Sequence, residues 1–309
     1  MTITHLVTHS GGFHADELLA SVILTRLFPH AQLVRTRASD WTTPAPHKII
    51  YDVGRVFDAD AQIFDHHQRP NPLREDGQPY SSFGLIWAHY GRDYLRALEV
   101  PEGDIDDIHA SFDAGFVLPI DLVDNGALAP ATAGVLAGLT LPSLLDTLKP
   151  VFDAPAADAD DVAFAAALPV ARAFVEGSLA GKAAKRRAHA LVLEAVARAG
   201  ASPVLELPMG MPFRKAVEEA GADHMLFVVH PRGDDWTVNG IRLRGDGFEL
   251  RADLPQAWAG LTDAALEAAS GVAGARFCHN GRFIAVAGTR AAALALADLA
   301  VAEAGAVTG

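Results

Sequence analysis

The first 54 residues alternate short apolar runs with polar turns, and this order constrains the fold more than any other feature of the sequence. The apolar run at residues 3–7 predicts a strand, and Ser10-Gly11-Gly12 predicts a flexible turn behind it. Residues 16–28 have apolar side chains at helical spacing, and Ile49-Ile50-Tyr51 predicts another buried strand. A strand, a glycine turn, a helix and a strand in this order are typical of a parallel α/β sheet.

Residues with metal-binding chemistry follow these strands directly. His9 follows the first strand, Asp52 follows a later one, and Asp65-His66-His67 follows a predicted short strand at residues 60–64. Ligands of parallel α/β sheets bind beyond the carboxyl ends of the strands, where these side chains lie. The tandem histidine alone is a weak signal in a chain with 13 histidines, so its meaning depends on other ligands that converge on it.

Further carboxylates and imidazoles enlarge this set. His14 and Asp16 lie just beyond the glycine turn, while Asp121 lies in a predicted helix at residues 119–123 and Asp124 in the turn after it. Asp16 could instead cap a helix, and Asp52 could be a turn former. Taken together, the mixed set is large enough for two divalent ions and suits Mn²⁺ or Fe²⁺. Paired ions of this kind are the usual apparatus of phosphoester hydrolysis.

Composition limits the function classes. The net charge of −13 argues against a broad nucleic-acid-binding surface, although cations held by carboxylates can present positive charge to a phosphate. The chain has no run of about 18 apolar residues and no signal peptide, so we expect no membrane span. Its single cysteine, Cys278, excludes an internal disulfide and fits a reducing, cytoplasmic setting. We expect this cysteine to be buried and structural.

The sequence changes in character after Gly200. Before it, residues 162–199 predict one long helix, or two helices broken near Gly177 or Gly181. After it, Asn280-Gly281 lies between two apolar runs and predicts a hairpin. Further short strands are predicted at residues 204–207, 225–229, 236–241 and 248–251. We therefore predict an α/β domain at residues 1–197 and a smaller α+β domain at residues 198–309.

Motifs in a fixed order along the chain resemble those of a known family. In the first half they are His9-Ser10-Gly11-Gly12-Phe13-His14-Ala15-Asp16-Glu17, Asp52-Val53-Gly54, Phe64-Asp65-His66-His67-Gln68, Ser81-Ser82-Phe83-Gly84-Leu85 and Asp121-Leu122-Val123-Asp124-Asn125-Gly126. In the second half they are Leu254-Pro255-Gln256-Ala257-Trp258, Ser270-Gly271-Val272 and Phe277-Cys278-His279-Asn280. With these motifs the chain resembles the MYG (melanocyte-proliferating gene) exonuclease family of the DHH phosphoesterase superfamily.

The resemblance implies a parallel-sheet phosphoesterase domain that holds two divalent metal ions, together with a smaller C-terminal domain. One ion would be bound by His9, His14 and Asp52. The other would be bound by Asp16, Asp52, His66 and either Asp121 or Asp124, with Asp52 bridging the two ions. Mn²⁺ is the expected metal, and Fe²⁺, Co²⁺ and Mg²⁺ are alternatives. The commoner superfamily motif has an aspartate in place of His14.

The resemblance also implies the reaction. It points to a 3′–5′ exonuclease that acts on RNA or short oligonucleotides, with a hydroxide bridging the ions as nucleophile. Asp65 would orient a histidine, and His67 would face the scissile phosphate. On the predicted hairpin, His279, Arg276 and Arg282 are candidates for binding substrate. A manganese pyrophosphatase and a non-catalytic, metal-dependent RNA-binding protein are the alternatives, and a homodimer stays open.

Overall fold

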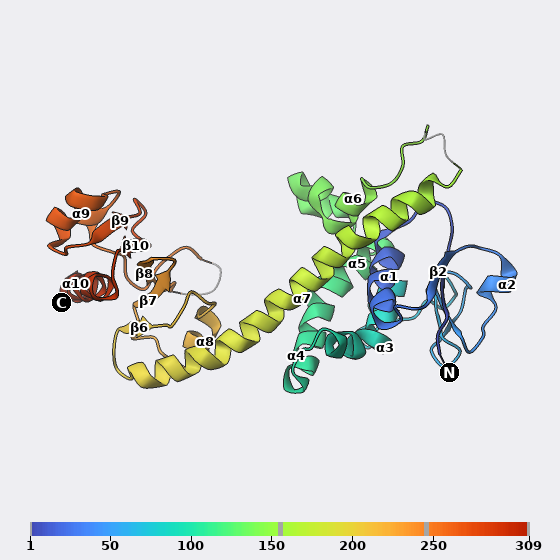
Figure 1. Cartoon of the computed structure of the whole chain (residues 1–309), viewed down its shortest axis with the longest axis horizontal. Coiled ribbons are helices and arrows are strands. Elements are labelled where there is room, and N and C mark those ends of the chain that lie inside the picture. The colour runs from blue at the N-terminus through green and yellow to red at the C-terminus, as the bar shows by residue number, and fades with distance from the viewer. Residues whose placement is uncertain (1, 154–156, 244–246, 308–309) are drawn as a thin grey trace. The chain divides into compact units, whose positions relative to one another are not determined.

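The computed structural model describes residues 2–153, 157–243 and 247–307 (Figure 1). The chain divides into two compact units, Met1–Ala183 and Ala184–Gly309. This division falls within the long helix α7 (Ala159–Ala199), whereas the sequence predicted a boundary near the end of that helix, between residues 197 and 198. Each unit has its own sheet and its own apolar core.

The first unit contains the predicted parallel sheet, with strands in the order β2-β1-β3-β5-β4. Strands β1 (His5–Thr8), β2 (Gln32–Arg35), β3 (Lys48–Tyr51) and β5 (Ile63–Phe64) run parallel, and only β4 (Phe57–Asp58) pairs antiparallel, at one edge. The strand predicted at residues 60–64 is thus shorter than expected. Because all four parallel strands point the same way, the residues that follow β1, β3 and β5 lie at one edge of the sheet.

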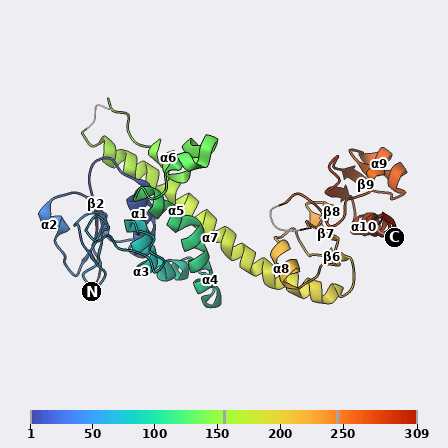
Figure 2. The same ribbon diagram turned by 180° about the vertical axis from the view of Figure 1, so that it is seen from behind.

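Helix α1 (Ala15–Leu27) is the centre of this unit (Figures 1 and 2). It packs against α3 (Ser82–Ala97), α5 (Leu118–Asp124) and α6 (Leu141–Asp146). Every residue of α1 from Asp16 to Leu24 is buried. A helix that is enclosed on all sides needs apolar residues all round, so the two acids buried in its first turn, Asp16 and Glu17, are exceptional.

Other short elements connect these helices. They are α2 (Ser39–Thr42), α4 (Glu102–Phe112), a π-helical turn at Asp113–Val117 and a 3₁₀ segment at Pro130–Leu139. Helix α4 ends at Phe112, and the chain continues through the π-helical turn into α5. This arrangement places Asp121 and Asp124 one turn apart in α5.

Helix α7 is continuous, so the predicted break near Gly177 or Gly181 is wrong. A glycine inside a helix costs only about 1 kcal/mol relative to alanine, which the packing of α7 offsets: Phe164 and Val175 are buried in the core of the first unit. Among the described residues, α7 is also the one helix that is long and apolar enough to cross a membrane by length and composition. A single helix of this kind is weak evidence for a membrane span, and 28% of its apolar window is buried inside the protein.

The second unit is an α+β fold whose sheet has the order β6-β7-β8-β10-β9. The strands are β6 (Val204–Glu206), β7 (Phe227–Arg232), β8 (Asp235–Gly240), β10 (Ile284–Ala287) and β9 (Ala275–Cys278). Strands β9 and β10 form the predicted hairpin around Asn280-Gly281. The strand predicted at residues 248–251 is wrong, because only Leu250 pairs there, in an isolated bridge with Arg242.

Helices cover both faces of this second sheet. Phe227 and Val229 of β7 pack with α10 (Arg290–Val307) on one face. Val228, which points the other way, packs with α8 (Arg214–Glu219) and the end of α7. Helix α9 (Asp263–Ser270), which the sequence did not predict, packs against β9. Cys278 is buried, as predicted, and burial raises the pKa of its thiol to about 11.

A candidate metal centre at the carboxyl ends of the first sheet

Three strand ends and one helix start supply the side chains of the candidate centre. His9 follows β1, Asp52 follows β3 and His66 follows β5. The N-terminal turn of α1 adds further acids and an imidazole at the same edge. Asp52 has a φ of +52°, in the left-handed region that an aspartate tolerates better than most residues. Backbone strain of this kind is common at functional sites.

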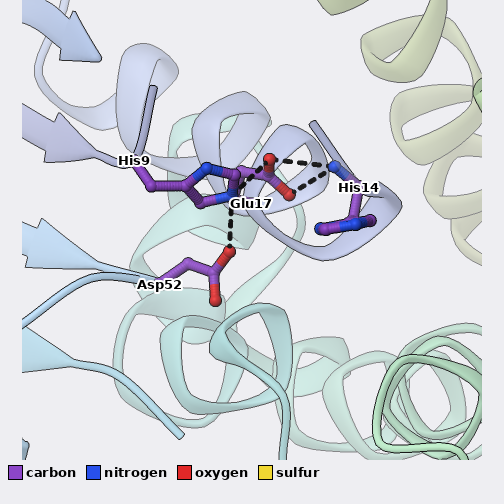
Figure 3. Close-up of side chains that lie close together, drawn as sticks. All are labelled: His9, His14, Glu17 and Asp52. Carbon is purple, nitrogen blue, oxygen red and sulfur yellow. Dashed lines mark hydrogen bonds and ion pairs between the residues drawn. The ribbon is translucent and has the colours of Figure 1, made fainter. Parts of the chain in front are cut away.

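The first group of ligands comprises His9, His14, Glu17 and Asp52 (Figure 3). The Nε2 of His9 lies 2.9 Å from the Oε1 of Glu17 and 3.1 Å from the Oδ2 of Asp52. Burial alone would lower the pKa of His9, but its hydrogen bonds to Asp52 and Glu17 raise it to about 10. A buried imidazole that faces two carboxylates occupies a strongly negative site, where a cation is favoured.

Glu17 was not among the predicted ligands, although it lies in one of the quoted motifs. The backbone N–H of His14 donates to both carboxylate oxygens of Glu17 at 2.9 Å. His14 is therefore the N-cap residue of α1, and the alternative reading of Asp16 as the N-cap is wrong. The spacing of His14 and Glu17, three residues apart, matches a capping box, and this spacing was the signal that could have located Glu17.

The second group comprises Asp16, His66 and Asp124. The Nε2 of His66 lies 3.3 Å from the Oδ2 of Asp124 and 3.9 Å from the Oδ2 of Asp16. The Oδ2 of Asp16 is buried and has no hydrogen-bond partner among the described residues. Burial, and the charges of Asp52 and Asp124, raise the pKa of Asp16 well above its usual value. A buried carboxylate oxygen without a partner is costly, so this donor set fits a divalent cation.

Asp52 lies between the two groups. Its Oδ2 faces His9, and its Oδ1 lies 3.4 Å from the Nε2 of His66. Burial would raise the pKa of Asp52, but its hydrogen bonds to His66 and His9 bring the pKa well below the usual range. The two oxygens of one ionised carboxylate are thus divided between two sets of ligands.

The structure separates the roles of Asp121 and Asp124. The carboxylate of Asp121 accepts hydrogen bonds from Ser81 Oγ at 2.7 Å, Gly84 N at 3.1 Å and Arg74 Nη2 at 2.6 Å. These contacts fasten the start of α3 to α5. Burial raises the pKa of Asp121 to about 6, against the opposing effect of Ser81 and Arg74. Of the two acids, only Asp124 belongs to a group of described residues that could hold a metal ion.

His67 pairs with Asp65, and it also belongs to a third group that could hold a metal ion, together with Asp52 and His66. The Nδ1 of His67 lies 2.7 Å from the Oδ1 of Asp65, and the other oxygen of Asp65 accepts from the backbone N–H of Arg55 at 2.5 Å. The hydrogen bond to Asp65 raises the pKa of His67. The side chain of His67 is 58% exposed, whereas that of His66 is 6% exposed. His67 therefore has its Nδ1 occupied and its ring accessible to solvent.

Asn125 is a further residue of the site, which the sequence indicated only as part of a turn. Its Nδ2 donates to the carbonyl oxygens of Tyr80 at 3.0 Å and Asp121 at 2.9 Å, which fixes the orientation of the amide. Its Oδ1 therefore faces the Nδ1 of His66, at 3.3 Å. An acceptor at Nδ1 holds the proton there and leaves the lone pair of Nε2 directed at Asp16, Asp52 and Asp124.

A cavity of about 600 Å³ opens onto these side chains. Its polar lining includes His14, Asp52, His66, His67 and Asp124. Its apolar lining includes Phe13, Ile120, Val123, Pro142 and Leu145. A cavity lined by both kinds of side chain can take a substrate with a charged group and a flat or apolar group.

The predicted substrate-binding residues of the hairpin belong to the second unit, and none of them joins the ligand groups found among the described residues. Arg276 forms an ion pair with Asp235, and Arg282 forms one with Asp253 at 2.5 Å. The Nδ1 of His279 accepts a hydrogen bond from the backbone N–H of Gly281 at 2.9 Å. This hydrogen bond from Gly281 fixes the orientation of the His279 ring.

The family model and the similar known proteins point to the same family. The family model described as Uncharacterised protein family (UPF0160), MYG1_exonuc, matches residues 5–301. The MYG1 exonuclease of Homo sapiens is 31% identical over 324 residues, which cover 96% of this chain and 85% of that protein. The MYG1 protein of Schizosaccharomyces pombe is 30% identical over 304 residues, covering 91% of this chain and 92% of that protein.

A solved structure of the exonuclease RecJ bound to manganese is also similar. It is 17% identical and covers 97% of this chain and 90% of its own, with a TM-score of 0.26. A RecJ from Thermus thermophilus in complex with Mg²⁺ gives 15% identity and a TM-score of 0.28, over 97% of this chain and 49% of that one.

Proposed function

Because the chain belongs to the UPF0160 family, whose members include proteins named MYG1 exonuclease, we propose that it is a metal-dependent phosphodiester hydrolase. The proposed reaction is the release of mononucleotides from the 3′ end of RNA or a short oligonucleotide. One observation carries the proposal. Carboxylates and imidazoles from three strand ends, α1 and α5 form ligand groups in which His14, Asp52, His66 and Asp124 line one cavity. These groups include the Oδ2 of Asp16, which has no partner among the described residues.

The ligand groups suit two divalent ions. His9, His14 and Asp52 would hold one, with Glu17 beside them, and Asp16, His66 and Asp124 would hold the other, with Asp52 shared. When bound, such paired ions supply an activated water and neutralise charge on the phosphoryl oxygens. Mixed carboxylate and imidazole ligands favour Mn²⁺.

Other side chains orient the reaction. His67 lines the cavity and is held by Asp65 through its Nδ1, so its Nε2 is available to give a proton to the leaving oxygen. The apolar side chains of the same cavity, which include Ile120 and Leu145, would take the base or sugar of the terminal nucleotide. In the second unit, His279 is the proposed contact to the rest of the strand, together with Arg276 and Arg282.

In the test, the full chain is incubated with Mn²⁺ and each of five substrates in separate reactions. The substrates are an RNA oligomer, a dinucleotide, a cyclic dinucleotide, pyrophosphate and an aryl phosphodiester. We expect mononucleotides from the RNA oligomer, and copies labelled at either end report the direction of attack. The isosteric Asp52→Asn variant is the control for contaminating nuclease. Hydrolysis of pyrophosphate without oligonucleotide cleavage would instead support a pyrophosphatase, and RNA binding without turnover would support a regulatory protein.

A further inference from the structure

The second unit has a cavity of about 520 Å³ on one face of its sheet. The face of the sheet that α8 covers at Val228 continues along β7 to His230. On β8, Asn239 lies opposite Val228, and Thr237 lies opposite His230, so all four side chains share this face. His230 and Asn239 line the cavity, which shows that the helices leave this part of the face uncovered.

Aromatic rings surround this uncovered part of the sheet. Phe248 is 87% exposed and Phe283 is 44% exposed, and both line the cavity. Among the described residues of the second unit, they are the only phenylalanines exposed to this extent. Burying a phenylalanine side chain is worth about 1.5–3 kcal/mol, so two exposed rings at one cavity indicate a surface that is covered by a ligand.

An arginine lies beside one of these rings in a strongly acidic chain. Arg242 lies over the ring of Phe248, 5.0 Å from its centroid, and both residues line the cavity. The carboxylate of the lining residue Asp253 pairs with Arg282 at 2.5 Å. Guanidinium groups beside exposed aromatic rings are typical of sites where bases stack and phosphates pass.

The polar side chains of the sheet face add hydrogen-bonding groups. The Nδ1 of His230 lies 2.9 Å from the carbonyl oxygen of Pro231, and its Nε2 lies 3.2 Å from both Thr237 Oγ1 and Asn239 Nδ2. These bonds hold the His230 ring and the Asn239 amide in place. The Oδ1 of Asn239 accepts no hydrogen bond from the described part of the chain, so it is available to the edge of a base.

We propose that this cavity binds one or two nucleotides of a single-stranded nucleic acid, with Phe248 and Phe283 stacking on bases and Arg242 contacting phosphate. The choice of ligand rests on the proposed function, because a nuclease supplies the strand. An uncharged lipid or an apolar peptide would match the two rings but not Arg242, whereas a nucleotide matches both. The site lies in the second unit and is separate from the metal ligands of the first.

The test measures binding without cleavage. The full chain in EDTA is titrated into a fluorescein-labelled, 12-nucleotide single-stranded RNA, and the dissociation constant is read from anisotropy. Phe248→Ala should weaken binding about 5- to 100-fold, the effect of losing one stacked base. Phe248→Trp should restore it. Phe152→Ala, which removes a fully exposed phenylalanine from the first unit, should leave binding unchanged.

Salt dependence separates stacking from phosphate contact. The slope of log Kd against log salt should fall by about 0.7 in Arg242→Ala, one phosphate contact to a single strand, and should stay unchanged in Phe248→Ala. Equal binding by wild type and Phe248→Ala, or no binding of the RNA by wild type, would overturn the proposal. Both results are independent of hydrolysis, so failure of the nuclease assay with binding intact would contradict only the proposed function.

Discussion

Gly84→Ala should destabilise the first unit, because the backbone of α3 passes directly over the carboxylate of Asp121. A Cβ added at Gly84 would lie 2.1 Å from the Oδ2 of Asp121 and 2.7 Å from its Oδ1 and Cγ. Such contacts are too short to exist, so Asp121 has to move. Its carboxylate is bonded to Ser81, Arg74 and Gly84 itself, and these partners resist the movement.

The size of the effect follows from three contributions. Forcing an extra methyl group into a packed core typically costs about 1–3 kcal/mol. Losing one hydrogen bond to a buried charged group adds about 1.5–3 kcal/mol. Replacing glycine by alanine in a helix stabilises the folded state by about 1 kcal/mol. We therefore expect a net loss of about 3 kcal/mol in the free energy of unfolding.

Gly177→Ala is the matched control. Gly177 also lies inside a helix of the first unit, but a Cβ there would meet no heavy atom within 4 Å. Alanine at this position should therefore stabilise the unit by up to about 1 kcal/mol. The same substitution is thus expected to have opposite signs at two helical glycines, and the difference depends on Asp121 alone.

A double-mutant cycle tests this dependence. Urea unfolding of the full chain is followed by circular dichroism, and the transition that Gly177→Ala shifts identifies the first unit. In an Asp121→Ala background the added Cβ has room, so Gly84→Ala should no longer destabilise, which gives a coupling of about 3 kcal/mol. The reasoning is refuted if Gly84→Ala costs the same in both backgrounds, or costs less than about 0.5 kcal/mol in wild type.

Three predictions concern the metal centre. Asp52→Asn should weaken the binding of both ions in calorimetry, because its two oxygens serve two ligand groups; two tightly bound ions in this variant would contradict the sharing. Asp124→Asn should lose metal while Asp121→Asn keeps it, and the reverse result would exchange their roles. His67→Ala should keep its metal content while kcat falls about 10²–10⁴-fold; loss of metal in proportion to activity would make His67 a ligand.

The sequence predicted those parts of the structure that depend on local pattern. The parallel sheet followed from apolar runs separated by a glycine turn, and the edge where His9, Asp52 and His66 meet followed from the direction of parallel strands. The hairpin around Gly281 followed from its turn residues. Each of these inferences uses residues close together in the chain, or a rule that holds for every parallel sheet.

The remaining features depend on packing between distant segments. Gly177 is typical of a helix break, but buried contacts hold α7 continuous through it. Residues 248–251 have the side chains of a strand, but no neighbouring strand pairs with them along their length, and only Leu250 forms a bridge there. Both errors arise because tertiary contacts outweigh local preference.

The choice between Asp121 and Asp124 shows why ligand chemistry alone does not identify a ligand. Both are aspartates of the same short helix, one turn apart, so charge and residue type are equal and their positions are similar. Their difference comes from a segment about forty residues earlier, where Gly84 lets α3 approach closely enough for its backbone N–H to reach Asp121. The carboxylate of Asp121 therefore bonds to α3, whereas the carboxylate of Asp124 lies beside His66. The glycine in the Ser81-Ser82-Phe83-Gly84-Leu85 motif therefore separates the surroundings of the two acids, because its backbone N–H bonds to Asp121 and not to Asp124.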